Sequence, residues 1–102
     1  MYKVIDKQKL AATITLLELQ APEIARKVRP GQFVIIRLNE EGERIPLTVN
    51  NFDREGGSIT IVFQEVGKTT RLLGRLNAGD SIADLVGPLG RHTEIEKFGN
   101  VI

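Results

Sequence analysis

The chain has 102 residues, of which 41% are apolar and 26% are charged, and this composition is typical of a single soluble globular domain. Its formal net charge of +1, with no long block of either sign, argues against a general attraction to nucleic acid or to an anionic membrane. The absence of cysteine and the presence of one histidine exclude disulfides, iron–sulfur ligation and a histidine-based metal cluster within this sequence.

The first half of the chain predicts short strands separated by turn residues. Residues 1–10 contain no apolar signal core and no run approaches the length of a membrane span, so we expect a cytoplasmic protein. Residues 2–19 alternate irregularly and predict two strands or one bent strand. Pro22 suits the first turn of a short helix over residues 21–26, and a strand is expected over residues 32–38.

The second half continues in the same way. Residues 55–57 (EGG) predict a hairpin turn into a strand over residues 58–64, and residues 70–76 predict a short helix. A final strand is expected over residues 81–86, closed by GPLG at 87–90. Many short strands with one small helix predict a closed or nearly closed antiparallel barrel. We expect its core to contain these side chains or their alternate-face neighbours: Phe33, Ile35, Ile59, Ile61, Phe63, Leu72 and Val86.

The stretch QEVGKTT at residues 64–70 ends like a nucleotide-binding P-loop. A P-loop requires a glycine five positions before the glycine that precedes the lysine, but Val62 stands there. A P-loop also opens a long crossover helix, whereas the helix expected here is short and contains Gly74. Both departures argue against a nucleoside triphosphate site.

The same stretch nevertheless has the chemistry of an anion site. Gly67 would free the backbone to turn after the strand, and Thr69 or Thr70 could cap the helix that follows. Free amides at the start of that helix, with Lys68 beside them, suit a phosphate. The alternative is a capped helix after a strand, with Lys68 merely solvated.

A second constellation lies at GERIPLT, residues 42–48. Pro46 cannot donate to a sheet ladder, which indicates an edge or a bulge, removes one ladder bond and exposes a neighbouring carbonyl. Thr48 places a hydroxyl on the same strand. A flat heteroaromatic ring could lie against Leu47 while backbone groups and Thr48 meet its polar edge. The alternative is an edge strand with a surface arginine at Arg44.

Four motifs, PGQFV, RIPLT, TIVFQEVGKTT and GDSIADLVGPLG, follow one another along nearly the whole chain. In them the chain resembles the FAD-binding barrel of the ferredoxin–NADP reductase superfamily. Within it, the chain is most similar to small flavoprotein subunits of NAD(P)H-dependent ferredoxin oxidoreductases, also described as sulfide dehydrogenases. The dihydroorotate dehydrogenase electron-transfer subunit is a near relative. The resemblance implies an all-β fold, a six-stranded antiparallel Greek-key barrel with one short helix, over residues 1–98.

The resemblance also implies the residues that contact FAD. The first flavin motif of the near relatives, arginine, proline, isoleucine or leucine, then serine, falls on residues 45–48, so Ile45 replaces the arginine and Arg44 sits one place earlier. The Thr48 hydroxyl is then expected near the reactive edge of the isoalloxazine ring. The full first motif comprises Arg44, Ile45, Pro46, Leu47 and Thr48.

The remaining flavin motifs lie on the next strand and its turn. The second motif is expected to run along the flavin mainly through its backbone, and it comprises Val62, Phe63 and Gln64. The third, glycine-x-glycine-threonine in the family, falls on Gly67, Lys68, Thr69 and Thr70. Thr69 replaces the second glycine, so its backbone must avoid positive φ or accept strain. With Thr70 as the phosphate-side hydroxyl, the resemblance makes GKTT a cradle for the FAD pyrophosphate.

Relatives continue beyond the barrel. Their next domain binds NAD(P)H, residues 99–102 resemble its start, and their cysteines near the C-terminus hold an iron–sulfur cluster. The parent protein is expected to take a hydride from NAD(P)H and pass electrons singly to iron–sulfur centres of a partner subunit. We expect the barrel alone to fold but to turn over NAD(P)H poorly, and Val101 and Ile102 to favour self-association. His92 is interpreted as exposed linker without a catalytic role.

Two other functions fit a small barrel. One is binding of RNA or protein, which predicts a basic face with interleaved aromatic residues, whereas the chain has four Phe and one Tyr. The other is a structural barrel without a ligand. A visible absorption spectrum of the purified protein separates both from a flavin domain.

Overall fold

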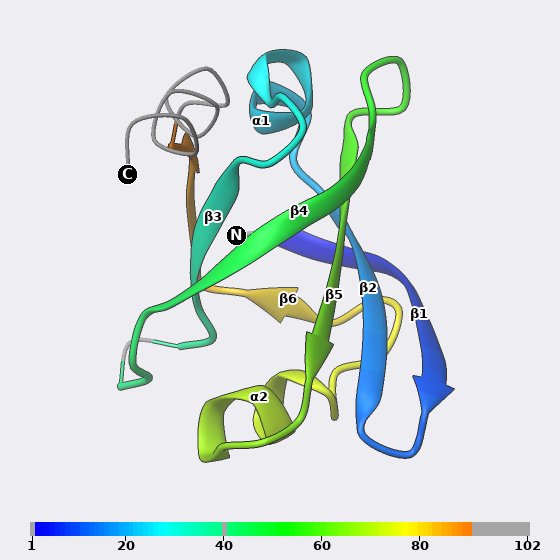
Figure 1. The fold of residues 1–102 in the computed structure, drawn as a ribbon, viewed down its shortest axis with the longest axis vertical. Coiled ribbons are helices and arrows are strands. Elements are labelled where there is room, and N and C mark those ends of the chain that lie inside the picture. Colours follow the sequence, from blue (N-terminus) through cyan, green and yellow to red (C-terminus); the bar gives the residue numbers. More distant parts are fainter. Residues whose placement is uncertain (1, 40, 91–102) are drawn as a thin grey trace, which may run out of the picture.

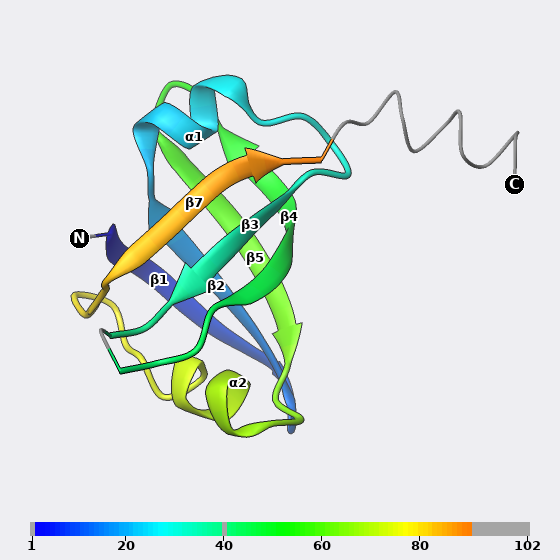
Figure 2. The same ribbon diagram turned by 90° about the vertical axis from the view of Figure 1, so that its left-hand side faces the viewer.

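The computed structural model describes residues 2–39 and 41–90, and these form a seven-stranded antiparallel sheet that curls into a nearly closed barrel (Figures 1 and 2). The strand order is β6-β1-β2-β5-β4-β3-β7. Along the chain the elements are β1 (Tyr2–Ala11), β2 (Ile14–Gln20), α1 (Pro22–Lys27), β3 (Phe33–Arg37), β4 (Ile45–Asp53), β5 (Ser58–Gln64), α2 (Lys68–Leu73), β6 (Ser81–Ile82) and β7 (Asp84–Leu89). The predicted fold class is confirmed.

The seventh strand arises at Ala83, where the chain changes its pairing partner. β6 pairs with β1, and β7 pairs with β3 at the other edge of the sheet. The Ala83 N–H donates to the carbonyls of Arg37 and Leu38, which turns the chain from one edge to the other. A single strand over residues 81–86 is therefore wrong. The GPLG segment is also no closing turn, because β7 runs on through Gly87 to Leu89.

The other predicted elements are found with small shifts. Residues 2–19 form two strands, β1 and β2, joined by a turn at Ala12 and Thr13. α1 begins at Pro22 as predicted. α2 begins at Lys68, earlier than predicted, and ends at Leu73. Beyond the C-cap residue Gly74, the amides of residues 75 and 76 donate to carbonyls three residues back rather than four.

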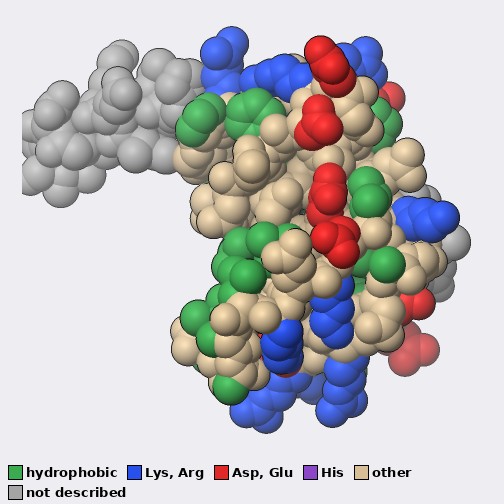
Figure 3. Space-filling model, turned by 90° about the vertical axis from the view of Figure 1, so that its right-hand side faces the viewer, with side chains coloured by type: hydrophobic (Ala, Val, Ile, Leu, Met, Phe, Trp, Pro, Cys, Tyr) green, Lys and Arg blue, Asp and Glu red, His purple; other side chains and the backbone are tan. Residues whose placement is uncertain are grey.

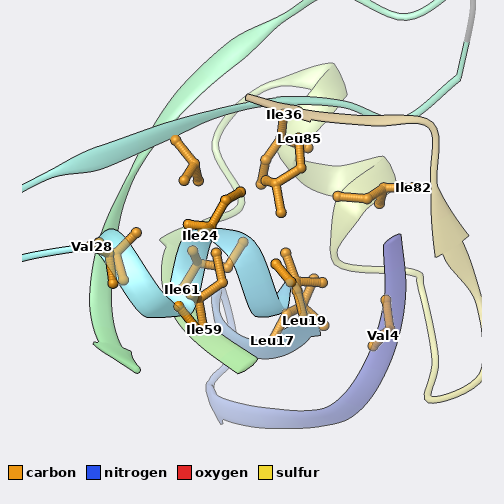
Figure 4. Close-up of a cluster of buried hydrophobic side chains, with 14 of the residues drawn as sticks. Val4, Leu17, Leu19, Ile24, Val28, Ile36, Ile59, Ile61, Ile82 and Leu85 are labelled. Carbon is orange, nitrogen blue, oxygen red and sulfur yellow. The ribbon is translucent and has the colours of Figure 1, made fainter. Parts of the chain in front are cut away.

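The core fills the interior of the barrel (Figure 4). Ile59, Ile61 and Phe63 of β5 are buried as predicted. On β3, α2 and β7 the buried residues are the alternate-face neighbours: Val34, Ile36, Leu73 and Leu85. Conversely, Leu72 and Val86 are 39% and 49% exposed. The predicted core is thus confirmed on β5 and displaced by one residue on the other three elements.

The two helices lie at opposite ends of the barrel, as Figures 1 and 2 both show. α1 contacts β5 and β7. α2 follows β5 directly and precedes the turn to β6. Neither helix has the length or the apolar run needed to cross a bilayer, and the same holds for all the helical structure within residues 2–39 and 41–90.

Candidate functional site

β4 changes partner along its length, and this opens a gap in the hydrogen-bond ladder. Its residues 45–48 pair with β3, whereas residues 49–53 pair with β5. β5 pairs with β2 along its whole length, so residues 62–64 are held on that side. The backbone edges of residues 45–48 and 62–64 therefore face each other without a strand between them. The edge predicted at Pro46 is found here, and a bulge lies further along, between Val49 and Asn51.

Backbone polar groups point into this gap. The Val49 N–H donates to the Gln32 carbonyl at 3.0 Å, so Val49 faces β3, and alternation turns the groups of Thr48 toward β5. The same alternation places the Pro46 nitrogen on the open side, so Pro46 removes no ladder bond, contrary to expectation. The Val62 N–H donates to Asn50 Oδ1 at 2.9 Å, which turns the Val62 carbonyl the same way.

Side chains on the outer face of β4 flank the gap. Pro46 and Thr48 are exposed, whereas Ile45 and Leu47 are half-buried and pack against the core. Leu47 packs against the core with part of its surface, and a contact between Leu47 and a flat ring stays a prediction. On β5, Phe63 is buried, so only its backbone is available to a ligand, while the Gln64 side chain is exposed. The outer face therefore offers Pro46, Thr48 and backbone groups to a flat ring.

The loop before α2 differs from its expected conformation. Gly67 has φ −133° and ψ 177°, an extended backbone that any residue adopts, so the expectation that glycine freedom is needed to turn is wrong. A Cβ at Gly67 would meet no heavy atom of the described residues within 4 Å. Gly67 therefore leaves open space above its own backbone. Thr69 is part of α2, and because no described non-glycine residue has positive φ, its backbone is unstrained.

Thr70 caps the loop rather than pointing away from it. Its hydroxyl accepts hydrogen bonds from the N–H groups of Val66 and Gly67 at 3.1 and 3.0 Å, and donates to the Gly67 carbonyl. These three bonds use the full capacity of a hydroxyl. The first-turn amides of α2, at Lys68 and Thr69, have no partner within a helix. The amides and Lys68 are therefore the groups ready for an anion, and a direct bond from Thr70 to a phosphate stays a prediction.

One hydrogen bond joins the two predicted motifs. The hydroxyl of Thr69, which is 9% exposed, donates to Glu43 Oε1, one residue before Arg44. Thr69 and Glu43 also border an open cleft of about 440 Å³. The cleft is lined by Leu38, Asn39, Glu41, Gly42, Glu43, Lys68, Thr69 and Leu72. Its charged lining combines the carboxylates of Glu41 and Glu43 with the ammonium of Lys68. Glu43 was missed because no local pattern marks it.

Arg44 is turned away from α2. Its side chain is 60% exposed, and Nη2 lies 3.8 Å from Asp84 Oδ2 at the start of β7. Arg37 of β3 hydrogen-bonds the same carboxylate. Because β3 and β7 lie on the far side of β4 from β5, this contact draws Arg44 away from the gap. Binding of a pyrophosphate by Arg44 stays a prediction. His92 lies outside the described residues.

Comparison with known proteins identifies the kind of domain. Residues 1–93 match the family described as oxidoreductase FAD-binding domain. A protein of Clostridium beijerinckii without an assigned function is 50% identical over 94 residues, which are 92% of this chain and 32% of that protein. A Thermotoga maritima homolog of the electron transfer subunit of dihydroorotate dehydrogenase B (NAD(+)) is 46% identical over 100 residues, which are 98% of this chain and 36% of the relative.

Solved structures with a similar fold belong to oxidoreductases as well. The structure of an NADH-dependent reduced ferredoxin-NADP oxidoreductase, studied for flavin-based electron bifurcation, superposes with a TM-score of 0.87 at 44% identity, over 89% of this chain and 33% of that one. The cytochrome b5 reductase domain of Ulva prolifera nitrate reductase shares the fold at a TM-score of 0.66 and 22% identity, over 87% of this chain and 40% of that one. The chain thus spans about a third of the length of these two curated relatives.

Proposed function

The chain belongs to the family of oxidoreductase FAD-binding domains, and we propose that it holds FAD across the gap between β4 and β5 and the loop before α2. The observation that carries this placement is the Thr69–Glu43 hydrogen bond, which holds the segment just before β4 against the first turn of α2. Family membership also favours this function over an RNA-binding or ligand-free barrel.

The ring end of the proposed site is built from backbone. The groups of Thr48 and the carbonyls of Pro46 and Val62 that face the gap are donors and acceptors for the polar edge of an isoalloxazine ring. The exposed Thr48 hydroxyl stands beside them. Because these groups belong to paired strands, they are fixed before the ligand arrives, and a fixed environment tunes the electronics of a flavin.

The phosphate end is built from the loop. Open space at Gly67, the first amides of α2 and the exposed Lys68 together suit a pyrophosphate. FAD bound there supplies a ring that accepts a hydride and releases electrons singly. The protein's own part is to orient that ring and to hold the phosphates near the Lys68 ammonium.

For the complete protein we propose a relay of electrons between NAD(P)H and the iron–sulfur centres of a partner subunit. Two relatives support this: one is named as an electron transfer subunit homolog, the other as an NADH-dependent reduced ferredoxin-NADP oxidoreductase. We place the NAD(P)H site and the iron–sulfur cluster outside these 102 residues, because the chain has no cysteine and spans about a third of those relatives.

Titration with FAD tests the proposed site. We expect FAD to bind with a change in flavin fluorescence, FMN to bind more weakly because it lacks the second phosphate, and ATP to compete poorly. Heat-denatured protein serves as the control for nonspecific quenching. Tight binding of ATP without any flavin response would contradict the proposal.

A further inference from the structure

The charged side chain of Glu65 is held in place beside the loop that leads into α2. It lies between β5 and α2, and its side chain is 14% exposed. Its Oε2 accepts hydrogen bonds from Lys9 Nζ and from Thr15 Oγ1, both at 2.5 Å. Thr15 is fully buried on β2, and Lys9 projects from β1. One carboxylate therefore connects both strands of the N-terminal hairpin to the loop.

The backbone of Glu65 is tied to the same hairpin. Its N–H donates to the carbonyl of Thr13, in the turn between β1 and β2, at 2.7 Å. The next N–H, that of Val66, donates to the Thr70 hydroxyl. The loop is thus fixed on one side by the hairpin and on the other by the first turn of α2.

Gly74 shows how closely the carboxylate packs against the end of α2. A Cβ at Gly74 would lie 2.5 Å from the Glu65 carboxyl carbon and within 2.7 Å of both carboxylate oxygens. Gly74 has φ −67° and ψ −13°, a helical backbone that does not require glycine. A side chain at this position would therefore require the Glu65 carboxylate to move.

Positive charges near Glu65 favour the same position of its carboxylate. Figure 3 shows Lys and Arg side chains gathered at the lower end of the molecule, the end that carries α2 in Figure 1. Hydrogen bonds from Lys9 and then Thr15 hold the pKa of Glu65 below its ordinary value, and the charges of Lys9 and Lys7 add to this effect. The carboxylate is therefore ionised at neutral pH and offsets part of the positive charge beneath the loop.

We propose that Glu65 is a positioning residue for the cofactor, which fixes residues 65–70 so that the phosphates of FAD meet amides already in place. This inference rests on the proposed FAD site. A loop that is ordered before binding loses less conformational entropy when the ligand arrives, so a tied loop binds more tightly than a free one. Lys9, Thr15 and Gly74 act through Glu65 and need not touch the ligand.

FAD titration of paired variants tests the inference. Glu65→Gln removes the charge, and Lys9→Met removes its partner; each is expected to raise the FAD dissociation constant about fivefold, the effect of releasing one or two ordered groups. Glu18→Gln is the matched control, because the Glu18 carboxylate also accepts a hydroxyl hydrogen bond, from Ser58 at 2.6 Å, but between β2 and β5 and away from the loop before α2. It should leave the constant within about twofold of the wild-type value.

Two further readouts separate positioning from a general loss of stability. In ligand-free protein, Glu65→Gln should speed amide hydrogen exchange at residues 65–67, whose N–H groups are hydrogen-bonded in this loop, while leaving β5 protected. Gly74→Ala should displace the carboxylate and weaken FAD binding as Glu65→Ala does, and the double variant should be no weaker than Glu65→Ala alone. If Glu65→Gln does not fold, Lys9→Met and Gly74→Ala carry the same test.

The outcomes are distinct. Wild-type FAD affinity in Glu65→Gln, with unchanged exchange at residues 65–67, would overturn the inference and leave the FAD site standing. Additive effects of Gly74→Ala and Glu65→Ala would also overturn it. A wild-type chain that binds no FAD would remove the proposed function and this inference with it, even if exchange showed that Glu65 orders the loop.

Discussion

The two helices of the barrel have the same length, six residues. They differ in whether the protein supplies hydrogen-bond partners for the backbone groups at the helix end. At the end of α1 the Arg54 guanidinium donates to the carbonyls of Ala25, Arg26 and Val28 and stacks over the Phe52 ring at 4.5 Å. The carbonyl end of α1 is thus closed by the protein itself. At the start of α2 the protein fixes the loop through Glu65 and Thr70 but leaves the space at Gly67 open.

We therefore expect α1 to contribute to the stability of the fold and the start of α2 to contribute to FAD binding. α1 buries Ile24 and Ala25 in the core, and the carbonyls at its C-terminal end already have a partner in Arg54. α2 buries Leu73, and its first amides face a region without a side chain at Gly67. Substitutions around α1 should therefore change the free energy of unfolding and leave FAD affinity unchanged, whereas substitutions around the start of α2 should change FAD affinity.

The largest expected effect lies under α1. Ile24 is 5% exposed, so Ile24→Ala should lower the free energy of unfolding by about 2–4 kcal/mol through lost burial and the cavity left behind. FAD affinity of the folded fraction should not change. Urea denaturation and FAD titration at a low temperature measure the two quantities, and weakened FAD binding would show that the two ends are coupled.

Removing the closure of α1 should have the next largest effect. Arg54→Met deletes the charged donor to three carbonyls while keeping an apolar stem, and should lower the free energy of unfolding by about 1.5 kcal/mol. Arg26→Met is the control, because its side chain is exposed on the same helix. An equal loss in both variants would mean that net charge, and not the carbonyl contacts, is responsible.

At the other end, Thr70 and Thr48 should act on different properties of bound FAD. Thr70→Ala removes the cap of the loop and should weaken FAD binding by about 1 kcal/mol. Thr48→Ala should alter the absorption spectrum or reduction potential of the flavin more than its affinity, since Thr48 lies beside the ring-side gap. Spectra and titrations of both variants give the comparison, and identical behaviour would contradict the assignment of the two ends.

Gly67→Ala should have opposite effects on the stability of the protein and on its affinity for FAD. Its backbone is extended and a Cβ meets open space, so the change should raise the free energy of unfolding by about 0.4–1 kcal/mol through the unfolded chain. The added methyl group should nevertheless weaken FAD binding, because it occupies the space proposed for the phosphates. Lower stability, or unchanged FAD affinity, would place the phosphates elsewhere.

The smallest expected effect is the pH dependence that Glu65 contributes. Its pKa in the folded protein lies below the ordinary value of 4.5, so the folded state favours the ionised form. Its contribution to stability is therefore present above pH 4.5 and is lost as the pH falls through the folded pKa. The difference in urea midpoint between wild type and Glu65→Gln should narrow over that acidic range; a widening difference would reverse the assigned sign.

The sequence predicts the fold best where the two faces of a strand differ. β5 alternates buried and partly exposed residues, and its core residues were predicted correctly. β3 reads FVIIR, apolar on both faces, so its pattern cannot show that Val34 and Ile36, rather than Phe33 and Ile35, face the interior. The division at Ala83 was unpredictable for a similar reason, because it depends on carbonyls of Arg37 and Leu38 far away in the chain.

In the candidate site, too, the sequence indicated local runs of residues but not the contacts between distant residues. The two motifs were found because each is a local run of residues, RIPLT and GKTT. The side chains that join and support them were missed because their contacts are distant in sequence: 26 residues separate Glu43 from Thr69, and 50 separate Thr15 from Glu65. The packing of Leu47 against the core was not predicted, because the register of β4 is set by its pairing with β3.

The most direct test of the FAD site is a titration of isotope-labelled protein with FAD, followed by amide NMR shifts. We expect saturable shifts at Thr48, at Val62 and over residues 67–70, with the amides of α1 unmoved. FMN should shift Thr48 and Val62 with smaller changes over residues 67–70. Shifts confined to α1, or none at residues 67–70, would contradict the placement of FAD across β4 and the start of α2.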